Sequence, residues 1–155
     1  MRIIVSGGRE YADREYLFAA LDRVNAWQEI TYLAQGEATG ADTLAKIWAQ
    51  GHGIEVGEFA ADWFRDCDER CKHKPKMRFG KRYCPVAGIY RNQVMYDAAD
   101  AKLTVTFPGG TGTSSMRSIS LRGGTPVIEF SGELTNGIPA CRVLPECDAP
   151  YFSAL

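Results

Sequence analysis

The segment LTVTFPGGTGT, residues 103–113, joins a short apolar run to three glycines within four positions. The run from Leu103 to Phe107 is apolar and β-branched, which is typical of one buried strand. Pro108 ends that strand, because proline has no backbone N–H to donate to a sheet. Thr113 and the two serines after it are candidate caps for a helix that runs to about residue 121.

A strand that passes through glycines into a helix gathers unpaired N–H groups and the positive end of the helix dipole at one point. Such a point suits an anionic group, most often a phosphate, and glycine lets the ligand reach the backbone. The segment therefore predicts a phosphate-binding loop in which Gly109, Gly110, Gly112 and Thr113 contact the ligand. A tight strand-to-helix turn without a ligand is the alternative.

The composition is that of an ordinary globular protein. The chain has 155 residues, enough for one domain with a sizeable core, of which 45% are hydrophobic and 24% are charged. Eighteen basic residues stand against 19 acidic ones, so the net charge of −1 gives no overall support for nucleic-acid binding. No apolar run approaches membrane-spanning length, and the N-terminus lacks the features of a signal peptide. We therefore expect a cytoplasmic protein with no membrane partner, whose five cysteines are free or bound to metal.

Strand-like runs alternate with helical patterns along the chain. The expected strands are residues 2–5, 30–34, 54–59, 103–107 and 126–130, and helical patterns lie between them. Five strands separated by helices predict an α/β fold, an open parallel sheet with helices on both faces. Glycine-bearing turns follow the first, second and fourth of these strands. All three turns therefore fall on the carboxyl edge of the sheet, where ligands bind in such folds.

Five motifs in register carry a resemblance to a known family. They are Ser6-Gly7-Gly8-Arg9, Gly36 with Thr39-Gly40-Ala41-Asp42, Ala61-Asp62-Trp63, Arg91-Asn92, and Phe107-Pro108-Gly109-Gly110-Thr111-Gly112-Thr113. This pattern resembles the SLOG superfamily, named for the DNA-processing protein SMF/DprA and the LOG enzymes, and more narrowly its small YspA-like branch. The resemblance implies a single Rossmann-like domain that binds nucleotides or nucleotide-derived small molecules, often as a homo-oligomer. It is interrupted by an insertion at about residues 64–87, and an irregular tail at about residues 131–155 lies outside it.

The LOG-type enzymes of this superfamily cleave the N-glycosidic bond of nucleoside monophosphates. Their glycine motif continues to a glutamate three residues beyond the threonine, and Met116 occupies that position here. Methionine can neither stabilise an oxocarbenium-like centre nor activate water. A binding or sensing module is therefore the first hypothesis. The alternative is an N-glycosidic hydrolase in which Glu37, Asp42 or Asp62 replaces the missing glutamate.

Other motif residues have roles that chemistry suggests. Arg9 can pair with a phosphate or carboxylate, or remain a solvated surface arginine. Asp42 can cap its helix or accept a hydrogen bond from a ribose hydroxyl. Arg91 begins a helix, where its charge opposes the dipole, so a nearby anion explains it better than helix stability does. Trp63 can stack on a base. The complete set of expected ligand-binding residues is Gly7, Gly8, Arg9, Gly36, Gly40, Asp42, Trp63, Arg91, Asn92, Gly109, Gly110, Gly112 and Thr113.

The insertion holds a second kind of site. Cys67, Cys71, His73 and Cys84 place three thiols and an imidazole within 18 residues of highly polar chain. These are the ligands of a tetrahedral structural zinc site, which would supply order that a small core cannot. A mobile loop with free cysteines is the alternative. No organic cofactor is indicated.

Residues 70–82 contain seven lysines and arginines and no acid. With Phe79 and Tyr83 nearby, this run predicts either a nucleic-acid contact or a solvated lid over the ligand pocket. The tail after Ser131 shows no periodic pattern. Its cysteines, Cys141 and Cys147, are open candidates for a metal site. The tail ends in apolar residues that would pack on the domain or on a second subunit: Tyr151, Phe152 and Leu155.

Overall fold

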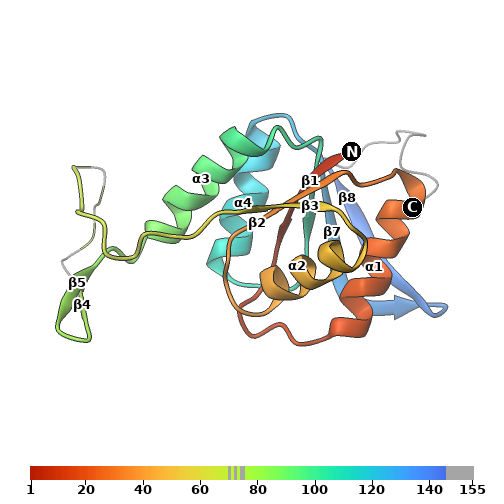
Figure 1. The fold of residues 1–155 in the computed structure, drawn as a ribbon, viewed down its shortest axis with the longest axis horizontal. Helices are drawn as coiled ribbons and strands as arrows, with labels where there is room; N and C mark the ends of the chain where they lie inside the picture. Colours follow the sequence, from red (N-terminus) through yellow and green to blue (C-terminus); the bar gives the residue numbers. More distant parts are fainter. Residues whose placement is uncertain (70, 72, 74–75, 146–155) are drawn as a thin grey trace.

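A computed structural model describes residues 1–69, 71, 73 and 76–145 (Figure 1). The elements in chain order are β1 (Arg2–Ser6), α1 (Arg14–Trp27), β2 (Tyr32–Gln35), α2 (Ala41–Gly51), β3 (Glu55–Glu58), β4 (Lys76–Arg78), β5 (Lys81–Tyr83), α3 (Ala87–Ala99), β6 (Leu103–Thr106), α4 (Thr111–Arg122), β7 (Val127–Thr135) and β8 (Ile138–Leu144). Six strands form the central sheet in the order β3-β2-β1-β6-β7-β8, and β4 pairs with β5 in a separate hairpin. The predicted Rossmann-like α/β fold is confirmed.

Helices cover both faces of the sheet because the buried strands are apolar on both sides. Along β1, Ile3 and Val5 pack with residues of α1 and α2, while Ile4 between them packs on the other face. Met95 of α3 and Met116 of α4 belong to that second cluster. The alternation follows from the two-residue period of a strand, and it gives the doubly wound arrangement that the strand and helix pattern predicts.

The order of the strands reverses at β1, which lies between β2 and β6. Both neighbours run parallel to it, and Ser6 at the end of β1 is in register with Thr106 at the end of β6. The loops that follow these two strands therefore leave the sheet side by side. In open α/β sheets this switch point is where ligands bind.

The prediction of an irregular tail is wrong for residues 131–144. β7 continues to Thr135 and turns back through Asn136 and Gly137, both with positive φ, into the antiparallel strand β8. Asn-Gly is a strong signal for a two-residue hairpin turn, but the glycines and prolines of this segment suggested breaks instead. Pro139 is accommodated because β8 is an edge strand. Residues 146–155, with Cys147, Tyr151, Phe152 and Leu155, lie outside the described residues.

Two helix starts also differ from the expectation. α4 begins at Thr111, with Gly110 at the N-cap and no side-chain cap, so the hydroxyls of residues 113–115 do not cap it. α3 begins at Ala87, which places Arg91 in its second turn rather than at its start. None of the helices in the described part of the chain is long and apolar enough to cross a membrane.

A substitution at Gly40 would test how tightly the loops at this edge of the sheet are packed. Its φ is +77°, and a Cβ there would overlap the carbonyl oxygens of Gly8 and Arg9. We expect Gly40→Ala to lower the free energy of unfolding by about 2 kcal/mol or more, because alanine is strained at this φ. Gly51, at the end of α2, has open space around its Cβ position and is the matched control. Gly51→Ala should raise stability by up to about 1 kcal/mol. Urea unfolding measures both, and equal midpoints for the two variants would contradict the packing described.

Candidate ligand pocket and Cys/His cluster

The loops after β1 and β6 touch through their backbones. The N–H of Gly8 donates to the carbonyl of Pro108 at 2.9 Å. A Cβ on Gly8 would lie 2.8 Å from that same oxygen, and a Cβ on Gly109 would lie 2.7 Å from the nitrogen of Gly8. Glycine is therefore required at both positions by the packing of one loop on the other.

The N-terminus of α4 opens into a cavity beside this contact. The first backbone hydrogen bond of the helix runs from Ser114 N to Gly110 O, so the three preceding N–H groups have no partner within the helix. A Cβ on Gly110 or Gly112 would meet no atom within 4 Å. The fold itself thus does not require glycine at these two positions.

The cavity measures about 360 Å³ and brings together most of the expected ligand-binding residues. Those that line it are Gly7, Gly8, Arg9, Asp42, Trp63, Arg91, Asn92, Gly110, Gly112 and Thr113. Gly36 lines an adjoining cavity of about 290 Å³, which shares Arg9, Trp63 and Arg91 with the first. Gly40 and Gly109 line neither of these two cavities and instead hold the loops together.

The sequence patterns missed several residues that line the larger of these two cavities, namely Ser6, Ala38, Pro85, Gly88, Ile89 and Thr111. Pro85, Gly88 and Ile89 come from the end of the insertion and the first turn of α3. Gly88 lies under the indole of Trp63, whose ring would be 3.4 Å from a Cβ at that position. Pro85 and Gly88, which lie shortly before Arg91 in the sequence, were the local pattern from which this part of the cavity lining could have been predicted.

Arg91 brings positive charge into the pocket. Its Nη1 donates to the carbonyl oxygens of Gly36 and Phe59, the latter at 2.8 Å, and its Nε donates to Asn92 Oδ1 at 3.0 Å. Burial lowers the pKa of the Arg91 guanidinium, and the nearby charge of Arg9 acts in the same direction. Within the described residues, neither arginine forms an ion pair. Two guanidinium groups thus face a cavity that has one buried carboxylate, Asp42.

Asp42 is 4% exposed and does not cap α2. Its Oδ2 accepts hydrogen bonds from the N–H groups of Gly36 at 3.1 Å and Ala38 at 3.3 Å. Burial raises the pKa of this carboxyl, while Arg91 and the two N–H groups oppose the shift. Asp42 therefore fixes the loop after β2, at the wall of the cavity.

One polar side chain, Asn92, ties α4 to the rest of the pocket. Asn92 is 3% exposed, and its Nδ2 donates to the carbonyl of Gly112 at 3.0 Å. Thr113 Oγ1 is buried and has no hydrogen-bond partner among the described residues. Elsewhere in the lining, the Arg9 guanidinium lies 4.8 Å from the centre of the Trp63 ring. The pocket thus has a fixed loop, an unpaired hydroxyl and an aromatic wall.

The candidate carboxylates for catalysis lie in different places. Met116, at the position of the LOG glutamate, is fully buried in the core and does not reach the cavity. Asp62 is exposed, and its Oδ1 accepts from Phe64 N at 3.2 Å. Glu37 is exposed and lines the adjoining cavity, where a hydrogen bond with Glu58 raises its pKa. Of the three candidates, Asp42 alone lines the larger cavity.

Another cavity, of about 480 Å³, lies on the other side of Thr113, between α4 and the β7–β8 hairpin. Its two arginines share one carboxylate, Glu129, which pairs with Arg117 at 3.0 Å and Arg142 at 2.6 Å. Although this cavity is larger, both of its guanidinium groups are already engaged in ion pairs, whereas among the described residues Arg9 and Arg91 form none.

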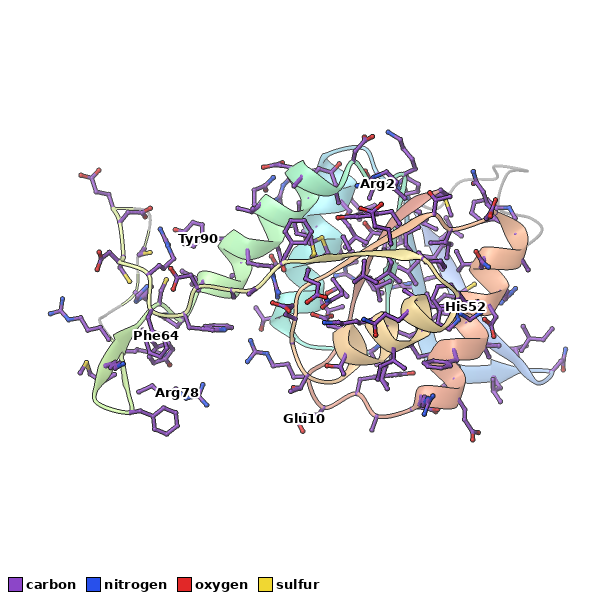
Figure 2. The ribbon with its side chains drawn as sticks, viewed as in Figure 1. Arg2, Glu10, His52, Phe64, Arg78 and Tyr90 are labelled. Atoms are coloured by element: carbon purple, nitrogen blue, oxygen red, sulfur yellow. The ribbon has the colours of Figure 1, made fainter. Side chains whose placement is uncertain are left out.

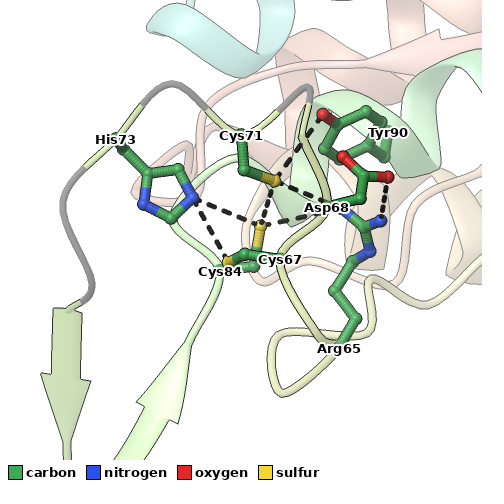
Figure 3. A network of polar contacts seen from close by, with 7 residues as sticks. All are labelled: Arg65, Cys67, Asp68, Cys71, His73, Cys84 and Tyr90. Atoms are coloured by element: carbon green, nitrogen blue, oxygen red, sulfur yellow. Dashed lines mark hydrogen bonds and ion pairs between the residues drawn. The ribbon is translucent and has the colours of Figure 1, made fainter.

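The predicted metal-ligating residues of the insertion come together in a compact cluster (Figure 3). Their four ligand atoms all lie within 4.8 Å of one another. Cys67 Sγ is 3.4 Å from His73 Nε2, which is 3.8 Å from Cys84 Sγ, and Cys84 Sγ is 3.8 Å from Cys71 Sγ. A tetrahedral zinc ion bound at usual distances would set these separations at about 3.6–3.8 Å. The cluster can therefore hold a metal ion, whereas Cys141 is elsewhere, against Arg23.

Arg65 supplies a positive charge beside two of the three thiols, Cys71 and Cys84. Arg65 Nη1 lies 3.7 Å from Cys71 Sγ and 3.9 Å from Cys84 Sγ, while its Nη2 pairs with Asp68 at 3.0 Å. Partial removal from water raises the pKa of the Cys71 thiol, but hydrogen bonds from Tyr90 and His73 outweigh this effect and hold it at about 7. These contacts surround the cluster as outer-shell groups surround bound metals.

Comparisons with known proteins agree with this fold. Residues 1–65 match the model of the YspA, cpYpsA-related SLOG family. None of the curated proteins matches the sequence. The X-ray structure of DNA processing protein A (DprA) from Streptococcus pneumoniae superposes with a TM-score of 0.60 at 15% identity, over 88% of this chain and 52% of that one. A UDP-N-acetylglucosamine 2-epimerase follows with a TM-score of 0.49 at 10% identity, over 88% of this chain and 33% of that one.

The chain thus spans about half the length of the DprA protein, and the likeness at this identity concerns the fold. The family match covers the loops after β1 and β2 and extends just past Trp63. The resemblance to the SLOG superfamily is therefore confirmed over residues 1–65, which match its YspA-related family, and the likeness to DprA over most of the chain is one of fold.

Proposed function

We propose that this chain binds the phosphate of a nucleotide or nucleotide-derived small molecule at the N-terminus of α4, as a binding or sensing module. The observation that carries the proposal is the open space at Gly112. A side chain would fit there without touching the protein, so the fold does not explain the glycine, whereas a ligand that approaches the backbone does.

The charges of the cavity support an anionic ligand. The two guanidinium groups of Arg9 and Arg91 outnumber the single buried carboxylate, Asp42, and the N-terminal residues of α4, whose first N–H groups have no partner within the helix, line the same cavity. Trp63 supplies a flat apolar wall of the kind against which a base stacks.

The variant Gly112→Ala distinguishes an effect on ligand binding from an effect on folding. We expect the variant to unfold at the same or a higher urea concentration than the wild type, because alanine favours a helix. Its affinity for nucleoside 5′-monophosphates should fall tenfold or more, equivalent to about 1.4 kcal/mol, because the added methyl group occupies the ligand's place. Isothermal titration with AMP, GMP, CMP and UMP measures this loss, and native mass spectrometry detects a nucleotide that co-purifies.

Gly51→Ala is the control, since it adds the same methyl group to a helical glycine far from the pocket. Unchanged monophosphate affinity in Gly112→Ala, or no binding of any of the four by wild-type protein that carries no co-purified ligand, would overturn the proposal.

An N-glycosidic hydrolase is the alternative within the same pocket. Because Met116 is buried, this activity would have to use Asp42 or Glu37. We expect no release of free base from the four monophosphates by the wild-type protein, as measured by liquid chromatography. Base release that disappears in Asp42→Asn or Glu37→Gln would instead establish the hydrolase, with Asp62→Asn as the control on an exposed carboxylate.

We also propose that zinc is the metal of the Cys/His cluster and that it orders the insertion. Three thiols and one imidazole at these separations are the donor set and size that zinc prefers. The described part of the insertion contributes only one small hairpin of regular structure, so a bound ion would supply stability that packing cannot.

Cys71→Ser and Cys84→Ser should each lose the zinc that the wild-type protein carries at one ion per chain, measured by elemental mass spectrometry after gel filtration. Cys141→Ser should keep it, because this thiol lies outside the cluster. Equal zinc content in all three variants, or none in the wild-type protein after zinc addition, would contradict the assignment. Light scattering of the same samples tests the expected homo-oligomer.

A further inference from the structure

The insertion carries a short arm that projects from the domain, formed by the hairpin of β4 and β5 (Figure 1). Its turn is made by Phe79 and Gly80, both with positive φ. Phe79 at the tip is 87% exposed and Met77 in the middle of β4 is 62% exposed, which is unusual for large apolar side chains. The exposed aromatic ring is therefore a feature that packing within the domain does not explain.

The register of the hairpin gathers positive charge on one face. Lys76 pairs with Tyr83 and Arg78 pairs with Lys81, and directly opposed residues point to the same side of a two-stranded sheet. Three cations and a tyrosine therefore share this face. Among the described residues, none of the three cations forms an ion pair. The acids of the insertion come earlier in the chain, and one of them, Asp68, is paired with Arg65.

Aromatic rings and cations alternate from the pocket to the arm. Arg9 lies over Trp63 at the pocket wall, and the next residue, Phe64, is 57% exposed. Lys81 Nζ of the hairpin lies 5.9 Å from the centre of the Phe64 ring. At the tip, the Arg78 guanidinium lies 5.3 Å from the Phe79 ring. Figure 2 shows Phe64 beside the hairpin that carries Arg78.

We propose that this series of rings and cations binds single-stranded nucleic acid, with one nucleotide in the pocket and the adjoining backbone along the arm. The inference rests on the proposed function for the pocket. Exposed rings between cations are what an unpaired strand requires, since bases stack on the rings while phosphates contact the cations. An acidic protein surface would use the cations but would leave Phe64 and Phe79 without a role.

The test measures binding of 3′-fluorescein-labelled dT12 and U12 by anisotropy, beside titration of unlabelled TMP and UMP. If three arm cations contact phosphates, wild-type affinity for the oligonucleotides should fall about 20-fold between 50 and 200 mM salt. Lys76→Glu, Arg78→Glu and Lys81→Glu combined should weaken oligonucleotide binding tenfold or more and remove most of that salt dependence. Affinity for TMP and UMP should stay within twofold, because these cations do not line the pocket.

Two further variants complete the design. Phe64→Ala should lower oligonucleotide affinity about fivefold or more through lost stacking. Arg14→Glu, Lys102→Glu and Arg122→Glu combined change the net charge equally but on residues remote from the arm, and should leave binding within twofold. Zinc content and thermal unfolding of each variant show that the arm is still folded.

The outcomes separate the two proposals. Mononucleotide binding without oligonucleotide binding, or equal oligonucleotide affinity for the arm variant and the wild type, overturns this inference and leaves the pocket proposal intact. Oligonucleotide binding that Gly112→Ala does not affect, in a protein that binds no mononucleotide, overturns both the pocket proposal and the continuous path. A loss of affinity in the remote-charge variant equal to that of the arm variant shows attraction by net charge alone, and overturns the assignment of the arm.

Discussion

The backbone contact between Gly8 and Gly109 is the constraint on which the pocket depends. β1 and β6 are adjacent parallel strands, so their loops must leave the sheet within a few ångströms of each other. A side chain on either glycine would force the loops apart and remove the hydrogen bond between Gly8 and Pro108. With the loops in contact, the start of α4 is held beside the end of β1, and the cavity forms between them.

Two kinds of glycine therefore occupy one motif for different reasons. Gly109 is packed against the loop after β1, whereas the Cβ position of Gly112 faces open space. A pattern of glycines in a sequence cannot distinguish these cases, since both appear as the same letter. The distinction needs the positions of neighbouring atoms, and it separates the residues that build a site from those that leave room for a ligand.

The strand pattern and the glycine turns were sufficient to predict the doubly wound sheet and to bring most of the expected residues to one edge. Features that depend on packing between distant parts of the chain were harder to predict. The burial of Met116 follows from the helical phase of α4 against α3, which a local motif does not specify. The Asn136-Gly137 pair is a local signal for a hairpin turn, but the nearby prolines led to the prediction of an irregular tail. The Cys/His cluster was recognised from residue types, although its spacing matches no standard finger, because chemistry limits which residues gather around a metal.

Cys84 connects the Cys/His cluster to the wall of the ligand pocket. Its thiol is part of the Cys/His cluster, and its N–H donates to the carbonyl of Trp63 at 2.8 Å, which holds one wall of the pocket. Whatever fixes this peptide also lowers the conformational entropy that the wall must lose when the cavity fills. If the cluster holds a metal ion and the cavity a ligand, as proposed above, occupancy of the two centres is thermodynamically coupled, and each changes the affinity for the other by the same factor. Protein prepared without the proposed cation would then behave as a weak binder, even with every cavity residue in place.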